Sequence, residues 1–160
     1  MTIEVGDTIP NVTLMKATAE GPEPVETGSF LAARKVALFS VPGAFTPTCS
    51  ARHLPGFVEK ADAFRAKGVD EVACVSVNDA FVMQAWGAQA GAEGKVTMLA
   101  DGNGEFAEAM GLVMDGSKFG MGRRGQRWSA IVEDGVVKEL NVEEPGAFSV
   151  SSADYTLEQL

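Results

Sequence analysis

Metal-binding side chains are scarce in this sequence. It contains a single histidine, His53, and only two cysteines, Cys49 and Cys74. Two cysteines are too few for a disulfide framework, and their separation does not fit the C-x-x-C pairs of zinc sites. With one histidine they provide too few ligands for a tetrahedral metal site, so we expect neither a metal ion nor another cofactor. The pattern instead favours one reactive and one buried cysteine in a reducing compartment.

Positive charge is also in short supply. The sequence has 13 lysines and arginines against 22 aspartates and glutamates, which gives a formal net charge of −9. This balance argues against a nucleic acid or an anionic membrane surface as the main partner. Long apolar runs are lacking too: no segment approaches the roughly 18 apolar residues of a membrane span, and residues 1–25 hold no run suited to a signal peptide. We therefore expect a cytoplasmic protein.

What is present is the composition of a globular domain. The 160 residues are 46% hydrophobic and 22% charged, which is most simply one domain over residues 1–160. Short apolar runs that read as buried strands alternate with helical stretches. The expected strands cover residues 36–41, 72–77 and 96–100, and the expected helices cover residues 49–67, 80–90 and 105–110. Pro55 should kink or restart the first helix, and Asn78-Asp79 should cap the second.

The last third of the sequence adds a hairpin and a final helix. Residues 127–133 and 135–142 flank Asp134-Gly135, the strongest short hairpin signal in the chain. Ser151-Ser152 should cap the helix that follows. Short βα units followed by an antiparallel hairpin and a helix predict a three-layer α/β/α domain with a mixed central sheet, which is the order of a thioredoxin-like fold.

Cys49 stands where the first predicted strand gives way to a helix. Functional sites of open α/β sheets lie at the carboxyl ends of strands, where this loop would place the cysteine. The unpaired N–H groups and the positive dipole end of a helix favour an anionic sulfur, which is the nucleophilic form. Thr46 occupies the position of the first cysteine of a C-x-x-C motif, so exchange by a dithiol pair is disfavoured. Cys49 is therefore the candidate nucleophile.

The eight residues 42–49, PGAFTPTC, resemble the active-site loop of peroxiredoxins, whose pattern is P-x-x-x-T-x-x-C. The resemblance is to the type II subgroup, closest to its plant-type and bacterial glutaredoxin-dependent branch. It is also carried by residues 53–57, 75–79, 81–83, 127–128 and 149–154. It implies a thioredoxin-like fold and an antioxidant enzyme that reduces hydrogen peroxide and alkyl hydroperoxides. Cys49 would become a sulfenic acid in the reaction.

The resemblance implies roles for three neighbours of this sulfur. The hydroxyl of Thr46 would bond both the sulfur and the peroxide, although the residue alone also reads as a turn or N-cap threonine. Pro42 would shape the loop and shield the thiolate from water. Arg127 would stabilise the charge on the leaving oxygen. Arg123 and Arg124 lie close by in the sequence, and we interpret them as surface charges.

His53 follows Cys49 by one helical turn, a spacing that would also suit a Cys–His nucleophilic pair. A peptidase would in addition need an orienting Asn or Asp and an oxyanion hole, so we expect His53 to support the loop through hydrogen bonds. Two alternative functions remain open at this point. One is a cysteine hydrolase that uses both residues, and the other is a non-enzymatic thioredoxin-like binding or holdase domain.

Resetting the enzyme requires a second thiol. The animal-type branch of the family carries a cysteine near the C-terminal end, where residues 147–151 contain none. Cys74 is a possible resolving or structural thiol, but on a central strand it would be buried, and a disulfide requires Cα atoms within about 7 Å. We expect glutathione with glutaredoxin, or thioredoxin, to reduce the sulfenic acid. The resemblance also implies a homodimer, with an interface near Pro42, Phe45 and Phe119.

Overall fold

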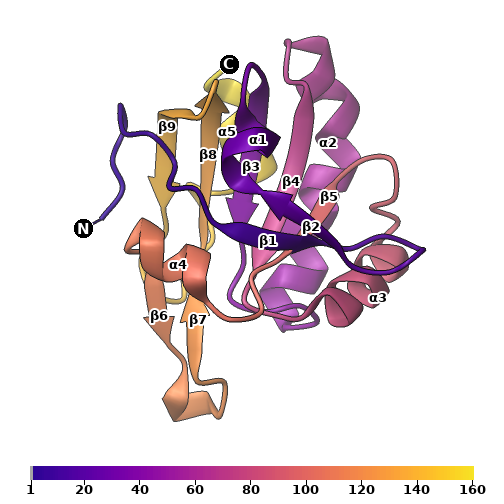
Figure 1. The fold of residues 1–160 in the computed structure, drawn as a ribbon, viewed down its shortest axis with the longest axis vertical. Coiled ribbons are helices and arrows are strands. Elements are labelled where there is room, and N and C mark those ends of the chain that lie inside the picture. The colour runs from indigo at the N-terminus through magenta and orange to yellow at the C-terminus, as the bar shows by residue number, and fades with distance from the viewer. Residues whose placement is uncertain (1) are drawn as a thin grey trace.

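The computed structural model describes residues 2–160 and contains a seven-stranded central sheet. Its strands are β1 (Thr13–Lys16), β2 (Glu23–Glu26), β3 (Lys35–Ser40), β4 (Glu71–Ser76), β5 (Thr97–Ala100), β8 (Trp128–Glu133) and β9 (Val136–Val142). They lie in the order β2-β1-β5-β4-β3-β8-β9, as Figure 1 shows. Strands β3, β4 and β5 are parallel, whereas β1 and β8 pair with their neighbours in the antiparallel sense. The sheet is therefore mixed, as predicted.

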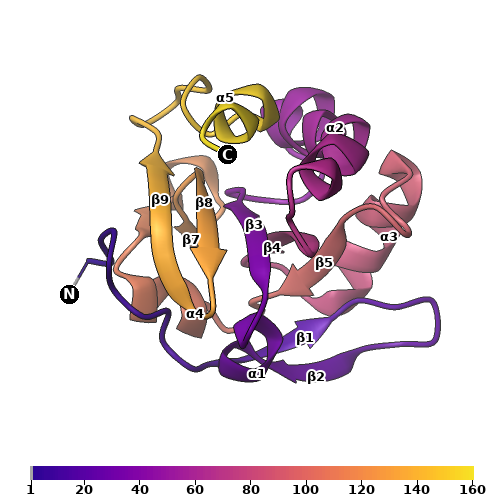
Figure 2. The ribbon, with the colours of Figure 1, turned by 90° about the horizontal axis from the view of Figure 1, so that it is seen from above.

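Helices cover both faces of this sheet (Figure 2). They are α2 (Leu54–Ala66), α3 (Ala80–Ala90) and α5 (Ala153–Glu158) on one face, and α1 (Thr27–Leu31) and α4 (Glu105–Met110) on the other. Successive side chains of a strand point to opposite faces. Phe39 and Cys74 consequently belong to the apolar core under α2 and α3, whereas Leu38 and Val75 belong to the core that includes α1 and α4. This arrangement confirms the predicted three-layer α/β/α, thioredoxin-like fold.

The bounds predicted from local sequence signals agree closely with the observed bounds for most helices and strands. The predicted central strands and hairpin strands lie within one residue of the observed ones, and the helices at 80–90 and 105–110 have the predicted bounds. Asp134 and Gly135 have φ of 49° and 77°, the pair of positive values that a two-residue type I′ hairpin turn requires. The Asp79 carboxylate accepts a hydrogen bond from the Val82 N–H at 2.9 Å and so caps α3.

The helix that carries Cys49 begins earlier and is less regular than expected. Its first turn starts at Pro47, and residues Cys49–His53 form one wide π turn before α2 begins. In this turn the Leu54 N–H donates to the Cys49 carbonyl, five residues back. Pro55 has no N–H to continue an α-helical ladder, and its ring needs room beside the preceding turn. The predicted restart at Pro55 is therefore a π turn, a feature often found at functional sites.

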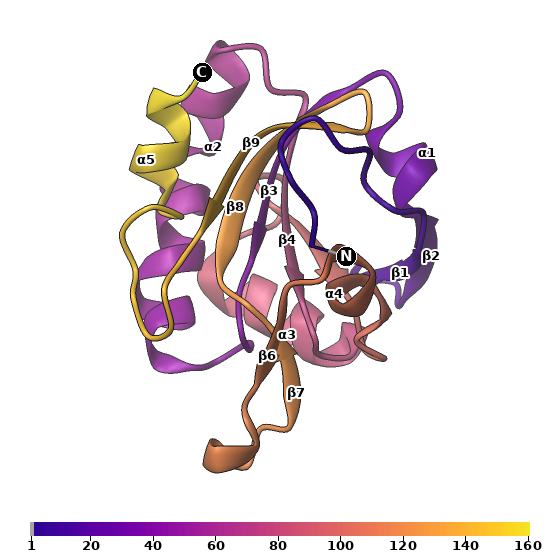
Figure 3. The same ribbon diagram turned by 90° about the vertical axis from the view of Figure 1, so that its left-hand side faces the viewer.

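Two local elements were not predicted. One is α1, and the other is a hairpin of β6 (Val113–Asp115) and β7 (Arg123–Gly125) joined through a 3-10 turn at Ser117–Phe119. The hairpin projects from the body of the domain, as Figure 3 shows. Strands of three residues are too short to display an alternating pattern, and a five-residue helix is too short to display a helical period.

Candidate active site

Cys49 lies in the first turn of the helix after β3, and its side chain is 0% exposed. Within residues 2–160, the backbone N–H groups of Thr48 and Cys49 have no acceptor in the protein, as expected at a helix N-terminus. These amides and the helix dipole favour negative charge on the sulfur. The preceding loop is fixed to the sheet because the Ala44 N–H donates to Asn78 Oδ1 at 2.9 Å. The sulfur therefore has a fixed place and a positive electrostatic environment.

Arg127 contacts this sulfur directly. Its Nη2 donates to Cys49 Sγ across 3.1 Å. The contact follows from the sheet, because Trp128 at the start of β8 pairs with Ser40 at the end of β3. The residue before β8 and the loop after β3 are thereby brought to the same edge of the sheet.

The other two arginines near this position in the sequence have different partners. Arg123 forms an exposed ion pair with Glu108. Arg124 donates to the Met121 carbonyl at 2.8 Å and to the Val77 carbonyl at 3.1 Å. The structure thus places Arg127, and neither neighbour, on the cysteine. Arg124 differs from the expected solvated surface charge, since two carbonyl groups hold its guanidinium.

His53 is fully buried and links Arg127 to the C-terminal segment. Its Nδ1 accepts from Arg127 Nη1 at 2.8 Å, and its Nε2 donates to the Ser151 carbonyl at 2.9 Å. Burial, followed by the positive charge of Arg127, lowers the pKa of His53 to about 3. The imidazole is therefore neutral, and both of its nitrogens are engaged. No ring nitrogen remains to take a proton from Cys49, which removes the base that a Cys–His hydrolase needs.

Thr46 and Pro42 form the rest of the loop. The Thr46 hydroxyl donates to the Gly43 carbonyl at 2.7 Å, and the Thr46 carbonyl accepts the Ser50 N–H at 2.9 Å. The hydroxyl proton of Thr46 is therefore used within the turn, while the hydroxyl oxygen retains lone pairs that can accept a hydrogen bond. Pro42 lines a cavity beside the cysteine together with Arg127. The shielding role expected of Pro42 stays a prediction.

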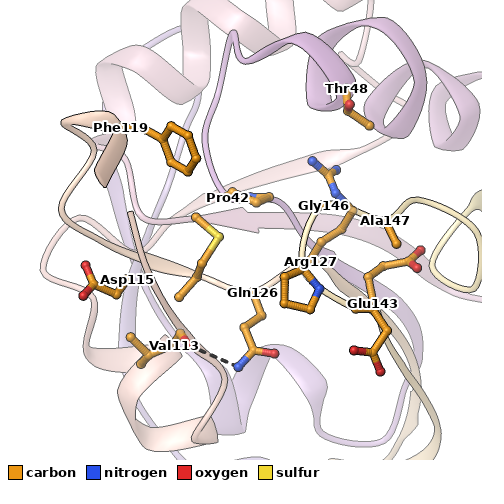
Figure 4. Close-up of a pocket in the computed structure, with 13 residues that line it drawn as sticks. Pro42, Thr48, Val113, Asp115, Phe119, Gln126, Arg127, Glu143, Gly146 and Ala147 are labelled. Carbon is orange, nitrogen blue, oxygen red and sulfur yellow. Dashed lines mark hydrogen bonds between the residues drawn. The ribbon is translucent and has the colours of Figure 1, made fainter. Parts of the chain in front are cut away.

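The cavity has a volume of about 560 Å³ and is shown in Figure 4. Val113, Met114 and Phe119 of the β6–β7 hairpin form much of its apolar wall. Residues 143–147 form another wall, and Thr48, beside the helix N-terminus, also lines the cavity. A small apolar molecule that entered here would reach the Arg127 guanidinium next to the sulfur. Sequence reasoning missed this cavity because its walls come from a hairpin and a loop without periodic patterns.

Cys74 occupies a different environment from Cys49. It is 0% exposed on β4, paired with Phe39 on one side and Met98 on the other. Both cysteines are free thiols. Burial raises the pKa of the Cys74 thiol well above its ordinary value, and the nearby charge of Cys49 acts in the same direction. Cys74 is therefore a protonated core side chain near the site, as its strand position suggested.

Phe148 covers the site from the C-terminal segment. Its ring centroid lies 5.0 Å from that of His53, and its face lies 4.7 Å from Cζ of Arg52 and 5.8 Å from Cζ of Arg127. Cations over an aromatic face are attracted by its quadrupole. No sequence pattern singled this residue out, because it lies in a loop and its partners are far away in the sequence.

Neither a metal-binding cluster nor a membrane-spanning helix is found within residues 2–160. No group of three or more His, Cys, Asp or Glu side chains is arranged to hold a metal ion in this part of the chain. None of the described helices has the length and apolar character needed to cross a bilayer.

Comparisons with known proteins agree over the length of the chain. The Redoxin family matches residues 4–157. Peroxiredoxin-2E-2, chloroplastic, of Oryza sativa subsp. japonica is 52% identical over 164 residues, covering 99% of this chain and 73% of the relative. Peroxiredoxin-2B of Arabidopsis thaliana is 45% identical, covering 99% and 98%. The crystal structure of reduced Prx3 in complex with hydrogen peroxide from Vibrio vulnificus has a TM-score of 0.95 at 51% identity and covers 99% of both chains. The likeness therefore extends far beyond the loop at residues 42–49.

Proposed function

The chain belongs to the type II peroxiredoxins, the thiol-dependent peroxidases of redox defence, and on this premise we propose that Cys49 is the thiolate that attacks the hydroperoxide. The observation that carries the proposal is the 3.1 Å contact between Arg127 Nη2 and Cys49 Sγ. A guanidinium at this distance favours the anionic sulfur, and so does the helix N-terminus. The related Vibrio vulnificus Prx3 was solved with hydrogen peroxide, which supports a peroxide as the substrate here.

The reaction begins when the peroxide enters the cavity beside Arg127. The thiolate attacks one peroxide oxygen, so that an S–O bond forms while the O–O bond breaks. The attacked oxygen keeps its hydrogen and becomes the sulfenic acid of Cys49. The other oxygen leaves with the electron pair, takes a proton from water and departs as water or alcohol.

Three side chains would assist this step. Arg127 stabilises the negative charge that develops on the leaving oxygen, because its remaining N–H groups lie beside the sulfur. Thr46 accepts the O–H of the incoming peroxide, since its own proton is already donated to Gly43. Pro42 keeps water from the sulfur as part of the cavity wall. His53 holds Arg127 through Nδ1 and does not itself exchange a proton.

We propose that an external thiol resets the enzyme. Glutathione or a protein thiol attacks the sulfenic sulfur, releases water and leaves a mixed disulfide, and a second thiol then restores Cys49. Glutathione with glutaredoxin, or thioredoxin, would supply these thiols. The buried position and protonated state of Cys74 support this route, because a protonated thiol is a poor nucleophile.

Cys74→Ser should therefore retain peroxidase turnover with glutathione and glutaredoxin. The substitution should lower the unfolding free energy by about 1–3 kcal/mol, because it buries a hydroxyl among apolar side chains. The measurement is steady-state turnover together with the intact mass of reduced protein seconds after one equivalent of hydrogen peroxide. Wild type and variant should both gain one oxygen. Loss of two hydrogens within one wild-type chain, or loss of turnover in the folded variant, would establish Cys74 as the resolving thiol instead.

We further propose a cytoplasmic homodimer. Phe119 lines the cavity and Phe45 lies in the loop before Cys49. Their surfaces are 78% and 47% exposed, which suits contact with a second copy. Sedimentation velocity at micromolar concentration should give the mass of two chains, and a single-chain mass would contradict the dimer. The two free thiols fit a reducing compartment.

A further inference from the structure

Glu143 is a buried carboxylate on the segment that follows β9. It is 7% exposed, and its Oε2 accepts three hydrogen bonds. The donors are the Ser149 N–H at 2.7 Å, the Ser151 N–H at 2.8 Å and the Ser151 hydroxyl at 2.7 Å. Burial raises the pKa of Glu143, but these bonds outweigh it and hold the pKa below its ordinary range. A buried charge is costly unless its lone pairs are satisfied, so the carboxylate fixes its donors in place.

Three hydrogen bonds connect Ser151, which donates to Glu143, with the catalytic sulfur. Ser151, whose N–H and hydroxyl both bond to Glu143, accepts the His53 Nε2–H on its carbonyl at 2.9 Å. His53 Nδ1 accepts from Arg127 Nη1 at 2.8 Å. Arg127 Nη2 then donates to Cys49 Sγ at 3.1 Å. The carboxylate is thus connected to the sulfur by a continuous series of hydrogen bonds.

The backbone closes this series into a ring. The Glu143 N–H donates to the Arg127 carbonyl at 3.0 Å, where the chain leaving β9 lies beside the chain entering β8. One residue therefore holds the main chain of Arg127 directly and its guanidinium through Ser151 and His53. The arginine is thereby held both at its backbone and at its guanidinium. Glu133, at the opposite end of β8 from Arg127, is exposed and belongs to no part of this ring.

We propose that Glu143 is a positioning residue for peroxide attack, which holds the Arg127 guanidinium on the sulfur of Cys49 through Ser151 and His53. The inference rests on the proposed role of Arg127. If the Glu143 carboxylate only held the 143–152 loop in place, its loss would have the same effect whether residue 127 is an arginine or not. A positioning residue must instead lose its effect on the reaction once the guanidinium is removed, and a double-mutant cycle measures that difference.

The experiment measures the second-order rate constant of hydrogen peroxide with reduced protein by stopped-flow fluorescence. Trp86 is a suitable reporter, since its Nε1 donates to Ser50 Oγ, beside Cys49, at 2.9 Å. Glu143→Gln keeps the side-chain size and one acceptor oxygen but removes the negative charge, so the hydrogen bonds from the serine donors become weaker. It should lower the rate constant about fivefold to tenfold, less than complete removal of the donor would. Glu133→Gln is the matched control, because Glu133 lies outside the cavity and the ring, and it should leave the rate constant unchanged.

In an Arg127→Met background, Glu143→Gln should not lower the rate constant any further. An unchanged rate in Glu143→Gln, or an equal fall in both backgrounds, would overturn the positioning role. A wild-type rate in Arg127→Met alone would instead overturn the role of Arg127, so the two failures are distinguishable. If Glu143→Gln does not fold, Glu143→Asp provides the same cycle, because it keeps the charge but is one methylene too short to hold all three donors. Glu143→Asp should lower the rate constant less than Glu143→Gln, and it should have no effect in the Arg127→Met background. A fall in the rate constant that persists there would count against the proposal.

Discussion

Replacing Cys49 with serine should reduce peroxide turnover to the uncatalysed rate. A serine hydroxyl is not ionised at neutral pH and has no equivalent of the sulfenic acid, so neither the attack nor the intermediate is available. Because enzymes typically accelerate their reactions by about 10⁶-fold or more, we expect the loss to be limited only by the background of the assay. Steady-state peroxide consumption with glutathione and glutaredoxin measures it.

The control for this substitution is the other cysteine. Cys74→Ser removes a thiol that is equally buried, and this variant should remain active. Activity should therefore depend on which of the two sulfurs is lost. Thermal unfolding of both variants establishes that they are folded. Residual turnover of a folded Cys49→Ser protein would mean that another group reacts with peroxide. A wild type that does not consume peroxide at all would favour the binding-domain alternative.

Arg127→Met should slow the reaction of Cys49 with hydrogen peroxide by a factor of ten or more, and by about a hundredfold if the guanidinium acts as a full transition-state donor. Methionine has similar length and no charge, so the variant removes the contact with the sulfur and the bond to His53 together. Stopped-flow mixing of reduced protein with peroxide separates this step from the later reduction. The fall should appear in the second-order rate constant for peroxide.

Arg123→Met is the matched control for this prediction. Arg123 lies four positions earlier, forms an exposed pair with Glu108 and has no contact with the site, so its loss should leave the rate constant unchanged. Arg127→Lys is informative as well. A lysine ammonium lacks the fork that lets one guanidinium reach both the sulfur and His53, so it should restore only part of the rate. A folded Arg127→Met variant with the wild-type rate constant would remove Arg127 from the site.

The candidate nucleophile could be predicted from local signals. A strand, a loop with two prolines and a helix start together located Cys49, because each signal lies within a few residues of the next. The roles of Thr46 and Pro42 came from the family pattern. Arg127 required the family pattern, since nothing near it in the sequence distinguishes it from Arg123. The fold was predictable for the same reason: buried strands and capped helices are local patterns, and short βα units allow few arrangements.

The parts that were missed depend on contacts between distant residues. His53 and Ser151 are 98 positions apart, and Arg127 and His53 are 74 positions apart, so no local window contains either pair. Phe148 and Glu143 lie in segments with no helical or strand period. The cavity is formed by a hairpin whose strands have only three residues each. These features exist only once the sheet has brought its edges together.

The neutral state of His53 also determines how the enzyme responds to acidity inside a cell. Histidine is the side chain that most often changes charge between pH 5 and 8. This protein has one, and its pKa of about 3 keeps it uncharged throughout that interval. The hydrogen bond from Arg127 to His53 therefore persists throughout this interval of pH. Any change of the peroxide rate constant between pH 5 and 8 must consequently come from groups other than His53.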